Sequence, residues 1–349
     1  MDIRILATLP RFSIEGEELI LPEARLLKIS FDEILEFEVQ QNSADYDKQR
    51  SRYNYNPPVF FEKWIEVPDE ILNMEVKTFI RELGKIATPY INTCVCAIHF
   101  YTGVPILSPF LSTIYFDYRS DINSQKKPSL IEQFTNIGAY RAYGESDKEY
   151  TLFNESPIIH ISRGEHESFG KFYRFIDSKS IILQHNELQS VIEPTQVLAL
   201  PGINYNIQLI LLTSALEAFL IPEITTKISE QFRKRFANLC QLQGEKEKLF
   251  LNLTYKLRSE LIHGNSIRKL FEKLPFNANA FLKTLTLCTI VGFCKFLHYV
   301  KINDEIESQL ETFRQILSYD ENDTRLTELL ASSDYSRIND LTHQWSLKK

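Results

Sequence analysis

The stretch 245–264 reads EKEKLFLNLTYKLRSELIHG, and it decides the fold of the C-terminal part of the chain. Successive side chains of a helix are about 100° apart around its axis. With that spacing, one apolar arc is formed by Phe250, Leu253, Leu257 and Leu261, and it is extended by Leu251, Tyr255 and Ile262. Gly264 stands where a glycine commonly follows the end of a helix. The sequence therefore predicts a helix over 245–263.

An arginine lies inside this apolar arc. Arg258 falls between Leu261 and Leu251 on the helical wheel, so we expect its guanidinium to be partly buried. A buried charge needs a partner, because its desolvation is otherwise costly. The predicted helix at 204–221 supplies one, since Glu217 is the only charged residue in that apolar run.

The carboxylate of Glu217 has two candidate partners in the sequence. Pairing with Arg258, or with Arg235 on the intervening helix, would satisfy both charges. One interpretation is a structural salt bridge that fixes how the helices pack. The other is that the carboxylate orients an arginine that holds a phosphate group. The sequence leaves both interpretations open.

A histidine follows the arginine at the end of the same predicted helix. His263 lies on the polar side of the wheel, with Ser259 one turn earlier on the same face. The negative end of the helix dipole favours the charged form of a histidine there, so His263 could exchange protons with a substrate near neutral pH. The simpler alternative is an exposed histidine that caps the helix.

The pattern is helical from Asn204 onward. Helices are predicted at 204–221, 224–241, 245–263, 266–273, 278–301 and 303–318, with two short ones after 322. Residues 201–349 are therefore predicted to form an all-α domain. Its boundary is expected within Pro194–Gly202, where prolines and a glycine cluster.

Residues 1–200 have a different pattern, with short alternating or β-branched runs between turn residues. Strands are predicted at Ile3–Leu9, Glu18–Leu21, Phe60–Val67, Thr93–Tyr101, Ser112–Tyr118, Ile158–Ser162, Lys171–Ile176 and Ser180–Gln184. One helix is predicted over 68–87, and the polar segments 41–58 and 119–130 are expected to be loops. This part is a β-rich mixed domain, either a sandwich or an irregular α+β fold, and the whole chain is of the α+β class.

Composition restricts the function and the location of the protein. The net charge of the 349 residues is −7, so bulk charge alone does not hold this chain to nucleic acid. The five cysteines are scattered through apolar stretches, which indicates buried reduced thiols rather than a disulfide framework. The apolar run Ala280–Val300 contains two lysines and is read as a core helix. With no leader pattern after Met1, a cytoplasmic location is expected.

A longer string of residues resembles a known family. Ala215-Leu216-Glu217 is followed by Arg235, and then by a Tyr-x-x-Arg-Ser-x-x-x-His-Gly pattern that runs from Tyr255 to Gly264. This order is similar to the HEPN superfamily, and within it to the Apea-like HEPN branch. The resemblance covers about residues 204–300.

The resemblance implies a helical bundle that dimerises and cleaves RNA without a metal or other cofactor. By analogy, Arg258 would hold the scissile phosphate, and His263 would act as general base or acid while the ribose 2′-hydroxyl attacks. Glu217 would orient the arginine, Ser259 would bond to the phosphate or to His263, and Tyr255 would pack. The products would carry a 2′,3′-cyclic phosphate and a 5′-hydroxyl, so the substrate is RNA, such as a tRNA or an mRNA.

The resemblance also implies a biological setting. Many such ribonucleases act in bacterial defence against phage, in abortive infection, or as toxins, and they stay latent until triggered. The N-terminal domain would then be a sensor or regulatory domain that binds a phage-derived trigger or a regulatory partner. One alternative is an inactive HEPN dimerisation or RNA-binding module in a toxin–antitoxin or regulatory assembly. Another is an unrelated activity in the N-terminal domain, with the bundle as its platform.

Two further groups of residues are candidates for binding. A path for RNA is predicted along the basic residues near the motif, which otherwise form an ordinary solvated face: Lys256, Arg268, Lys269 and Lys273. In the N-terminal part, His160, Glu165 and His166 suggest a metal or ligand site, although a surface loop is the preferred interpretation. The sequence contains no glycine-rich phosphate loop and no His-Glu-x-x-His motif.

Overall fold

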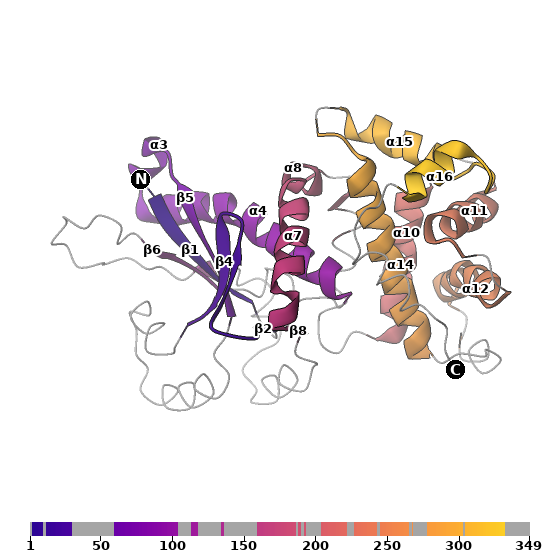
Figure 1. Cartoon of the computed structure of the whole chain (residues 1–349), viewed down its shortest axis with the longest axis horizontal. Coiled ribbons are helices and arrows are strands. Elements are labelled where there is room, and N and C mark those ends of the chain that lie inside the picture. Colours follow the sequence, from indigo (N-terminus) through magenta and orange to yellow (C-terminus); the bar gives the residue numbers. More distant parts are fainter. Residues whose placement is uncertain are drawn as a thin grey trace. The chain divides into compact units, whose positions relative to one another are not determined.

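A computed structural model describes much of the chain. The described residues are 2–9, 12–29, 59–103, 113–117, 134–135, 159–185, 188–189, 192, 204–221, 227–242, 245–264, 267, 278–302 and 304–331. The fold is mixed α+β, with a small antiparallel sheet near the N-terminus and a mostly helical remainder, as the sequence predicted at this level (Figure 1).

The chain divides into two compact units. The first comprises Met1–His99 and Ile106–Ser180, and the second comprises Phe100–Pro105 and Ile181–Lys349. The predicted boundary, Pro194–Gly202, lies wholly outside the described residues.

The first unit contains a six-stranded antiparallel sheet. In spatial order its strands are β3 (Glu18–Leu21), β4 (Ala24–Lys28), β5 (Val59–Glu66), β1 (Asp2–Leu9), β6 (Thr113–Asp117) and β7 (Phe134–Thr135). Side chains alternate between the faces of a strand, and on β1 one face is fully buried, with Ile3, Ile5 and Ala7. The carboxylate of Glu62, also buried, pairs with Arg4 and Arg25 on the two neighbouring strands.

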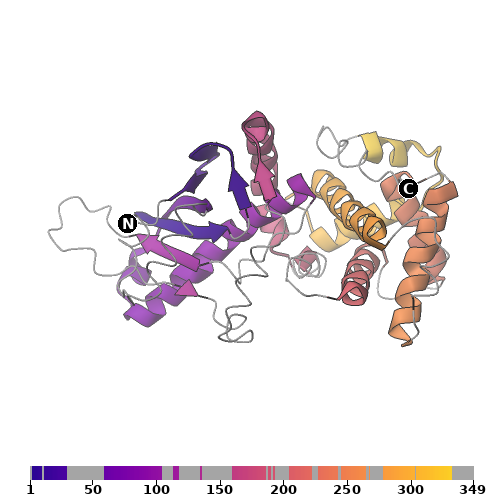
Figure 2. The same ribbon diagram turned by 90° about the horizontal axis from the view of Figure 1, so that it is seen from below.

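Helices and a second small sheet accompany these strands. The helices are α3 (Asp69–Leu72), α4 (Val76–Thr102), α7 (His166–Asp177) and α8 (Ser180–Leu183), with a short 3-10 turn, η3, at Arg163–Glu165. Helix α4 lies against one face of the sheet (Figures 1 and 2), where the ring of Tyr90 faces the ammonium of Lys63. Strand β2 (Phe12–Ile14) pairs in parallel with β8 (Ile159–Ile161).

Three of the predicted strands are wrong, because they are helical. Thr93–Tyr101 belongs to α4, and this stretch is so completely buried that its apolar residues run on without a helical period. Lys171–Ile176 belongs to α7, and Ser180–Gln184 coincides with α8 and the residue after it. The predicted helix over 68–87 also differs, since α3 and α4 are separate and α4 continues to Thr102.

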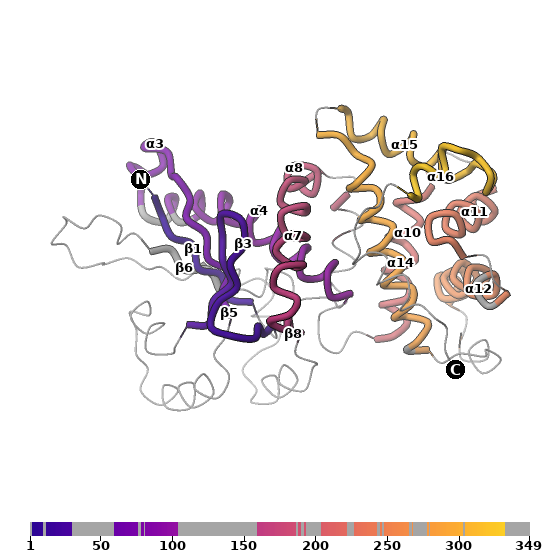
Figure 3. Tube along the Cα trace, viewed as in Figure 1, coloured from indigo at the N-terminus to yellow at the C-terminus, as the bar shows by residue number. Residues whose placement is uncertain are grey.

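The second unit is built from helices. They are α10 (Tyr205–Leu220), α11 (Ile228–Cys240), α12 (Glu245–Ile262), α14 (Ala278–Tyr299), α15 (Ile306–Ile316) and α16 (Thr324–Ala331). In Figures 1 and 3, α10 and α14 run up the view while α11 and α12 are seen nearly end-on, so the two pairs cross steeply. Phe219 of α10 lies at the centre of the core, in ring contact with Phe293, Phe296 and Phe313. Most of the predicted helix at 266–273 lies outside the described residues.

Helix α14 is the buried centre of this unit. A side chain at Gly292 would meet Leu239 of α11, whose Cδ2 lies 2.5 Å from the position a Cβ would take. The ammonium of Lys295 donates a hydrogen bond of 2.7 Å to the carbonyl of the same leucine. All five cysteines are free and buried, as predicted.

Only one helix within the described ranges is long and apolar enough to cross a membrane. It is Ala280–Tyr299, and 83% of its apolar window is buried inside the protein. That burial agrees with the core helix of a soluble protein.

Candidate functional site

The predicted ion pair between two helices is present. The Nε atom of Arg258 on α12 lies 2.9 Å from Oε2 of Glu217 on α10. The sequence offered two partners for Glu217, Arg258 and Arg235, and the structure contains the pair with Arg258. Both side chains keep some contact with solvent, since 25% of the arginine and 19% of the glutamate surface is exposed. The Nε side of the guanidinium therefore lies against the carboxylate, and the arginine side chain as a whole stays partly exposed.

The contact is ionic rather than a well-directed hydrogen bond. Both atoms are buried, yet among the described residues neither has a hydrogen-bond partner of acceptable geometry, so the Nε–H of Arg258 does not point along the line to the carboxylate. An ion pair of this kind, partly open to water, contributes at most about 1 kcal/mol to stability. The pair therefore adds little to the stability of the fold, which is compatible with a role for Glu217 in orienting the guanidinium of Arg258.

Arg235 does not share the carboxylate of Glu217. Its guanidinium is buried and donates to the carbonyl of Leu220 at 2.6 Å and to the hydroxyl of Ser318 at 2.8 Å. Burial lowers the pKa of Arg235 below its ordinary value. The predicted supporting arginine thus binds the end of α10 rather than the predicted site.

A second buried arginine binds the same helix end. Arg314 of α15 donates to the carbonyl of Phe219 at 2.9 Å and to that of Ala218 at 2.8 Å. Sequence reasoning missed it, although Arg314 falls beside Phe313 and Leu317 in an amphipathic helix, the same signal that singled out Arg258. Three successive carbonyls at the end of α10 therefore accept hydrogen bonds from two arginines.

His263 is exposed to solvent, in contrast to the buried Arg235 and Arg314. It follows α12, and its backbone N–H donates to the carbonyl of Ser259 at 3.1 Å, which extends the helix by one residue. The side chain of His263 is exposed, and that of Ser259 is partly so. Gly264 has a φ of +74° and donates to the carbonyl of Leu261, the left-handed ending that glycine favours.

The described chain does not bring His263 and Arg258 together. Five residues along a helix rotate the side chain by about 140°, at 100° per residue. Arg258 uses its side of α12 to meet Glu217 on α10, and His263 faces the exposed side. One copy of the chain therefore holds the two predicted catalytic groups on different faces of one helix.

The remaining predicted residues are distributed as follows. Tyr255 packs, with its ring 5.9 Å from that of Phe232 on α11, measured between centroids. Lys256 is exposed on the outer side of α12. The other predicted RNA-binding residues lie outside the described ranges: Arg268, Lys269 and Lys273.

The histidine cluster of the first unit has a local structural role. Glu165 accepts hydrogen bonds from the backbone and the hydroxyl of Ser162, a capping box that starts η3 and α7. His160 is exposed, with Nδ1 at 2.9 Å from the hydroxyl of Ser13. Burial, together with the charge of Arg163, lowers the pKa of His166. Within the described ranges, no group of three metal-ligating side chains is placed to hold an ion.

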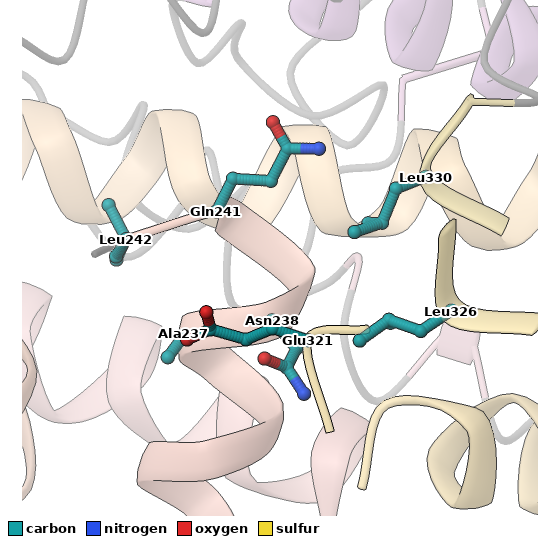
Figure 4. A pocket seen from close by; sticks show the side chains of 7 residues that line it. All are labelled: Ala237, Asn238, Gln241, Leu242, Glu321, Leu326 and Leu330. Atoms are coloured by element: carbon teal, nitrogen blue, oxygen red, sulfur yellow. The ribbon is translucent and has the colours of Figure 1, made fainter. Parts of the chain in front are cut away.

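A small pocket lies away from these residues, between the end of α11 and α16 (Figure 4). It is lined by Ala237, Asn238, Gln241, Leu242, Glu321, Leu326 and Leu330. Its volume of about 50 Å³ is far below that of a site for a nucleotide. The amide of Asn238 is already used, because it donates to the carbonyls of Leu317 and Tyr319.

Comparisons with known proteins identified no similar protein. No family model matches the chain, and neither a curated protein nor a solved structure matches it. The functional argument therefore depends on the residues and on the geometry described above.

Proposed function

We propose that this protein is a metal-independent endoribonuclease of the HEPN type, in the Apea-like branch. Its role would be in bacterial defence, such as abortive infection, or as a toxin. The observation that carries the proposal is the contact of 2.9 Å between Glu217 and Arg258. It joins the two helices that hold the two halves of the resembling sequence pattern, and the arginine side chain remains partly exposed.

The proposed reaction is transfer of the phosphoryl group to the adjacent 2′-hydroxyl. His263 removes the proton from that hydroxyl, and its oxygen forms a bond to phosphorus. The guanidinium of Arg258 stabilises the negative charge that grows on the non-bridging oxygens, and Ser259 donates a hydrogen bond to one of them. The bond from phosphorus to the 5′-oxygen breaks, and that oxygen takes up a proton. The products are a 2′,3′-cyclic phosphate and a 5′-hydroxyl.

The separation of the two catalytic groups calls for two copies of the chain. Since Arg258 and His263 face different sides of α12, each active site in this proposal combines the arginine of one copy with the histidine of the other. Exposed apolar side chains on the same two helices support a homodimer through the helical unit. Ile207 on α10 is 51% exposed, and Ile262 on α12 is 53% exposed.

The same separation is the observation that favours a second candidate function. If His263 only ends α12 and the pair of Glu217 and Arg258 only packs the helices, the unit is an inactive HEPN module for dimerisation or RNA binding. It would then serve a regulatory or toxin–antitoxin assembly. In either case the first unit is proposed to bind a phage-derived trigger or a regulatory partner in the cytoplasm.

The deciding experiment is complementation between two inactive variants. Wild type, Arg258→Ala, His263→Ala and the control His160→Ala, which changes another exposed histidine, are incubated with total RNA in excess EDTA. We expect cyclic-phosphate ends from wild type and from the control only. If the enzyme is latent, toxicity on expression together with its trigger replaces the cleavage assay.

Co-expression of Arg258→Ala with His263→Ala should restore cleavage. A mixed dimer contains one intact site, made from the arginine of one copy and the histidine of the other. Activity of either single variant at the wild-type level would refute the proposed roles. Inactive variants that do not complement each other, beside an active wild type, would refute the shared site.

A further inference from the structure

A stripe of polar side chains runs along the outer side of α12 toward His263. Asn252, Lys256, Ser259 and His263 recur at intervals of four, three and four residues. They therefore lie within about 60° of each other around the helix, at 100° per residue. The stripe is on the order of 16 Å long, at 1.5 Å per residue. Three of its members are exposed and Ser259 is partly exposed.

Helix α11 adds a cation to this stripe. The Nη1 atom of Arg233 donates to the amide oxygen of Asn252 at 2.9 Å, and its Nε donates to the carbonyl of Ser229 at 3.0 Å. Two hydrogen bonds to different helices fix the plane of the guanidinium. Its remaining N–H groups have no partner within the described ranges, and the side chain is exposed.

The neighbouring cations of α11 are arranged differently. The ammonium of Lys234 lies 3.0 Å from the carboxylate of Asp320, and that of Lys227 lies 3.7 Å from Glu230. Those two charges are neutralised by acids. Within the described ranges Arg233 is held by neutral oxygens only, and no carboxylate neutralises its charge there.

We propose that Arg233, Asn252, Lys256 and Ser259 bind the sugar–phosphate backbone of single-stranded RNA and lead it to His263. Guanidinium and ammonium groups bind phosphates, and the amide and hydroxyl suit the ribose and phosphate oxygens. These contacts go to the sugar and phosphate groups and not to the edges of the bases, so binding is independent of sequence. The inference depends on the proposed function only for the fate of the RNA at His263.

The charge of the stripe fits this ligand. The chain as a whole is acidic, with a net charge of −7, but residues 201–349 carry 19 basic and 17 acidic side chains. Arg233 and Lys256 are two cations on the stripe, and His263 adds a third when it is protonated. Two acidic residues, Glu245 and Glu260, flank the stripe on α12, so we expect moderate affinity with a strong dependence on salt.

The test measures RNA binding by the full chain over a range of salt concentrations. The probe is a labelled single-stranded RNA with 2′-O-methyl groups, which cannot be cleaved, and fluorescence anisotropy reports binding. Arg233→Gln and Lys256→Gln should each weaken binding several-fold. Each should also lower the slope of log affinity against log salt by about 0.7, the value for one phosphate contact of a single strand. Lys234→Gln, an equal change of charge on the next residue, should leave both quantities unchanged.

The outcomes separate this inference from the proposed function. If Arg233→Gln weakens binding but wild type never cleaves RNA, the stripe is an RNA-binding site and the proposed ribonuclease function is refuted. If wild type cleaves and both stripe variants bind and cleave as wild type does, the nuclease stands and the stripe is refuted. The stripe is also refuted if Lys234→Gln weakens binding as much as its neighbour, if wild type binds no RNA, or if a duplex or an acidic peptide binds as tightly.

Discussion

The C-terminal ends of α10 and α12 lie in the same unit, but their last carbonyl groups are satisfied in different ways. At the end of α10, the carbonyls of Ala218, Phe219 and Leu220 accept hydrogen bonds from two buried arginines. At the end of α12, Gly264 turns the chain and the side chain of His263 is exposed. The polar groups at the end of α10 are used to hold the helices together, whereas the side chain at the end of α12 is accessible to a ligand.

Burial explains the difference between the two ends. The last carbonyls of a helix have no partner within it, and together they form the negative end of its dipole. Water reaches the end of α12, so a glycine in the left-handed conformation is sufficient there. At the end of α10, Phe219 and Leu220 are buried although Ala218 is exposed, and cations from α11 and α15 take the place of water at the buried carbonyls.

The largest effect is expected from Arg314→Ala. The change leaves the carbonyl of Phe219 buried without a donor and removes the donor to the partly buried carbonyl of Ala218, so the free energy of unfolding should fall by about 2 kcal/mol. Urea denaturation measures it. Arg325→Ala is the control, because that arginine is exposed and should cost no more than about 0.5 kcal/mol. Equal losses in the two variants would mean that the end of α10 does not need its arginines.

A smaller effect is expected from Gly264→Ala, at the other helix end. The φ of +74° is strained for alanine, although no atom lies within 4 Å of the added Cβ. The loss should therefore be about 1 kcal/mol and purely conformational. Gly164→Ala also adds its Cβ to open space, but without the positive φ, and thermal unfolding should show little change. A cost at Gly164 equal to that at Gly264 would contradict this account.

The pair that links the two helices should contribute less. A double-mutant cycle of Glu217→Gln and Arg258→Gln should give a coupling energy of about 0.5 kcal/mol, because both side chains are partly exposed and their contact is poorly directed. A coupling above about 2 kcal/mol would identify a buried structural pair, and it would weaken the case that Glu217 serves mainly to orient the arginine.

The smallest change in stability is expected from His263→Ala. Because this side chain is exposed, the free energy of unfolding should stay within about 0.5 kcal/mol of wild type. Under the proposed function RNA cleavage is lost in the same variant. A large loss of stability would instead assign His263 to the fold.

Charges in apolar surroundings were the most informative signal in the sequence. The wheel position of Arg258 and the isolation of Glu217 predicted a contact that the structure contains. The same signal was present at Arg314 and was overlooked, and the sequence pattern does not identify the backbone carbonyls that Arg314 binds. The sequence also could not show that Arg235 would bind Leu220, since that choice depends on how three helices pack.

Strand predictions failed in α4, where complete burial hides the helical period, and in α7, where the helical period was overlooked. In α7 the run Lys171–Ile176 is rich in aromatic residues, as strands often are, but Phe169, Phe172, Tyr173 and Ile176 are buried at helical spacing. The capping pair of Ser162 and Glu165 was the available signal for a helix start. Glu18–Leu21, in contrast, was predicted with the bounds that β3 has, because one face is buried and the other exposed.

The close packing of α11 on α14 has a consequence for how the sequence can vary. Glycine in the middle of a helix is unfavourable, so Gly292 is explained by the space that Leu239 occupies. The two positions form one steric unit, and a change at one alters what the other accepts. Among relatives of this protein, a larger residue at position 292 should be inherited together with a smaller one at 239.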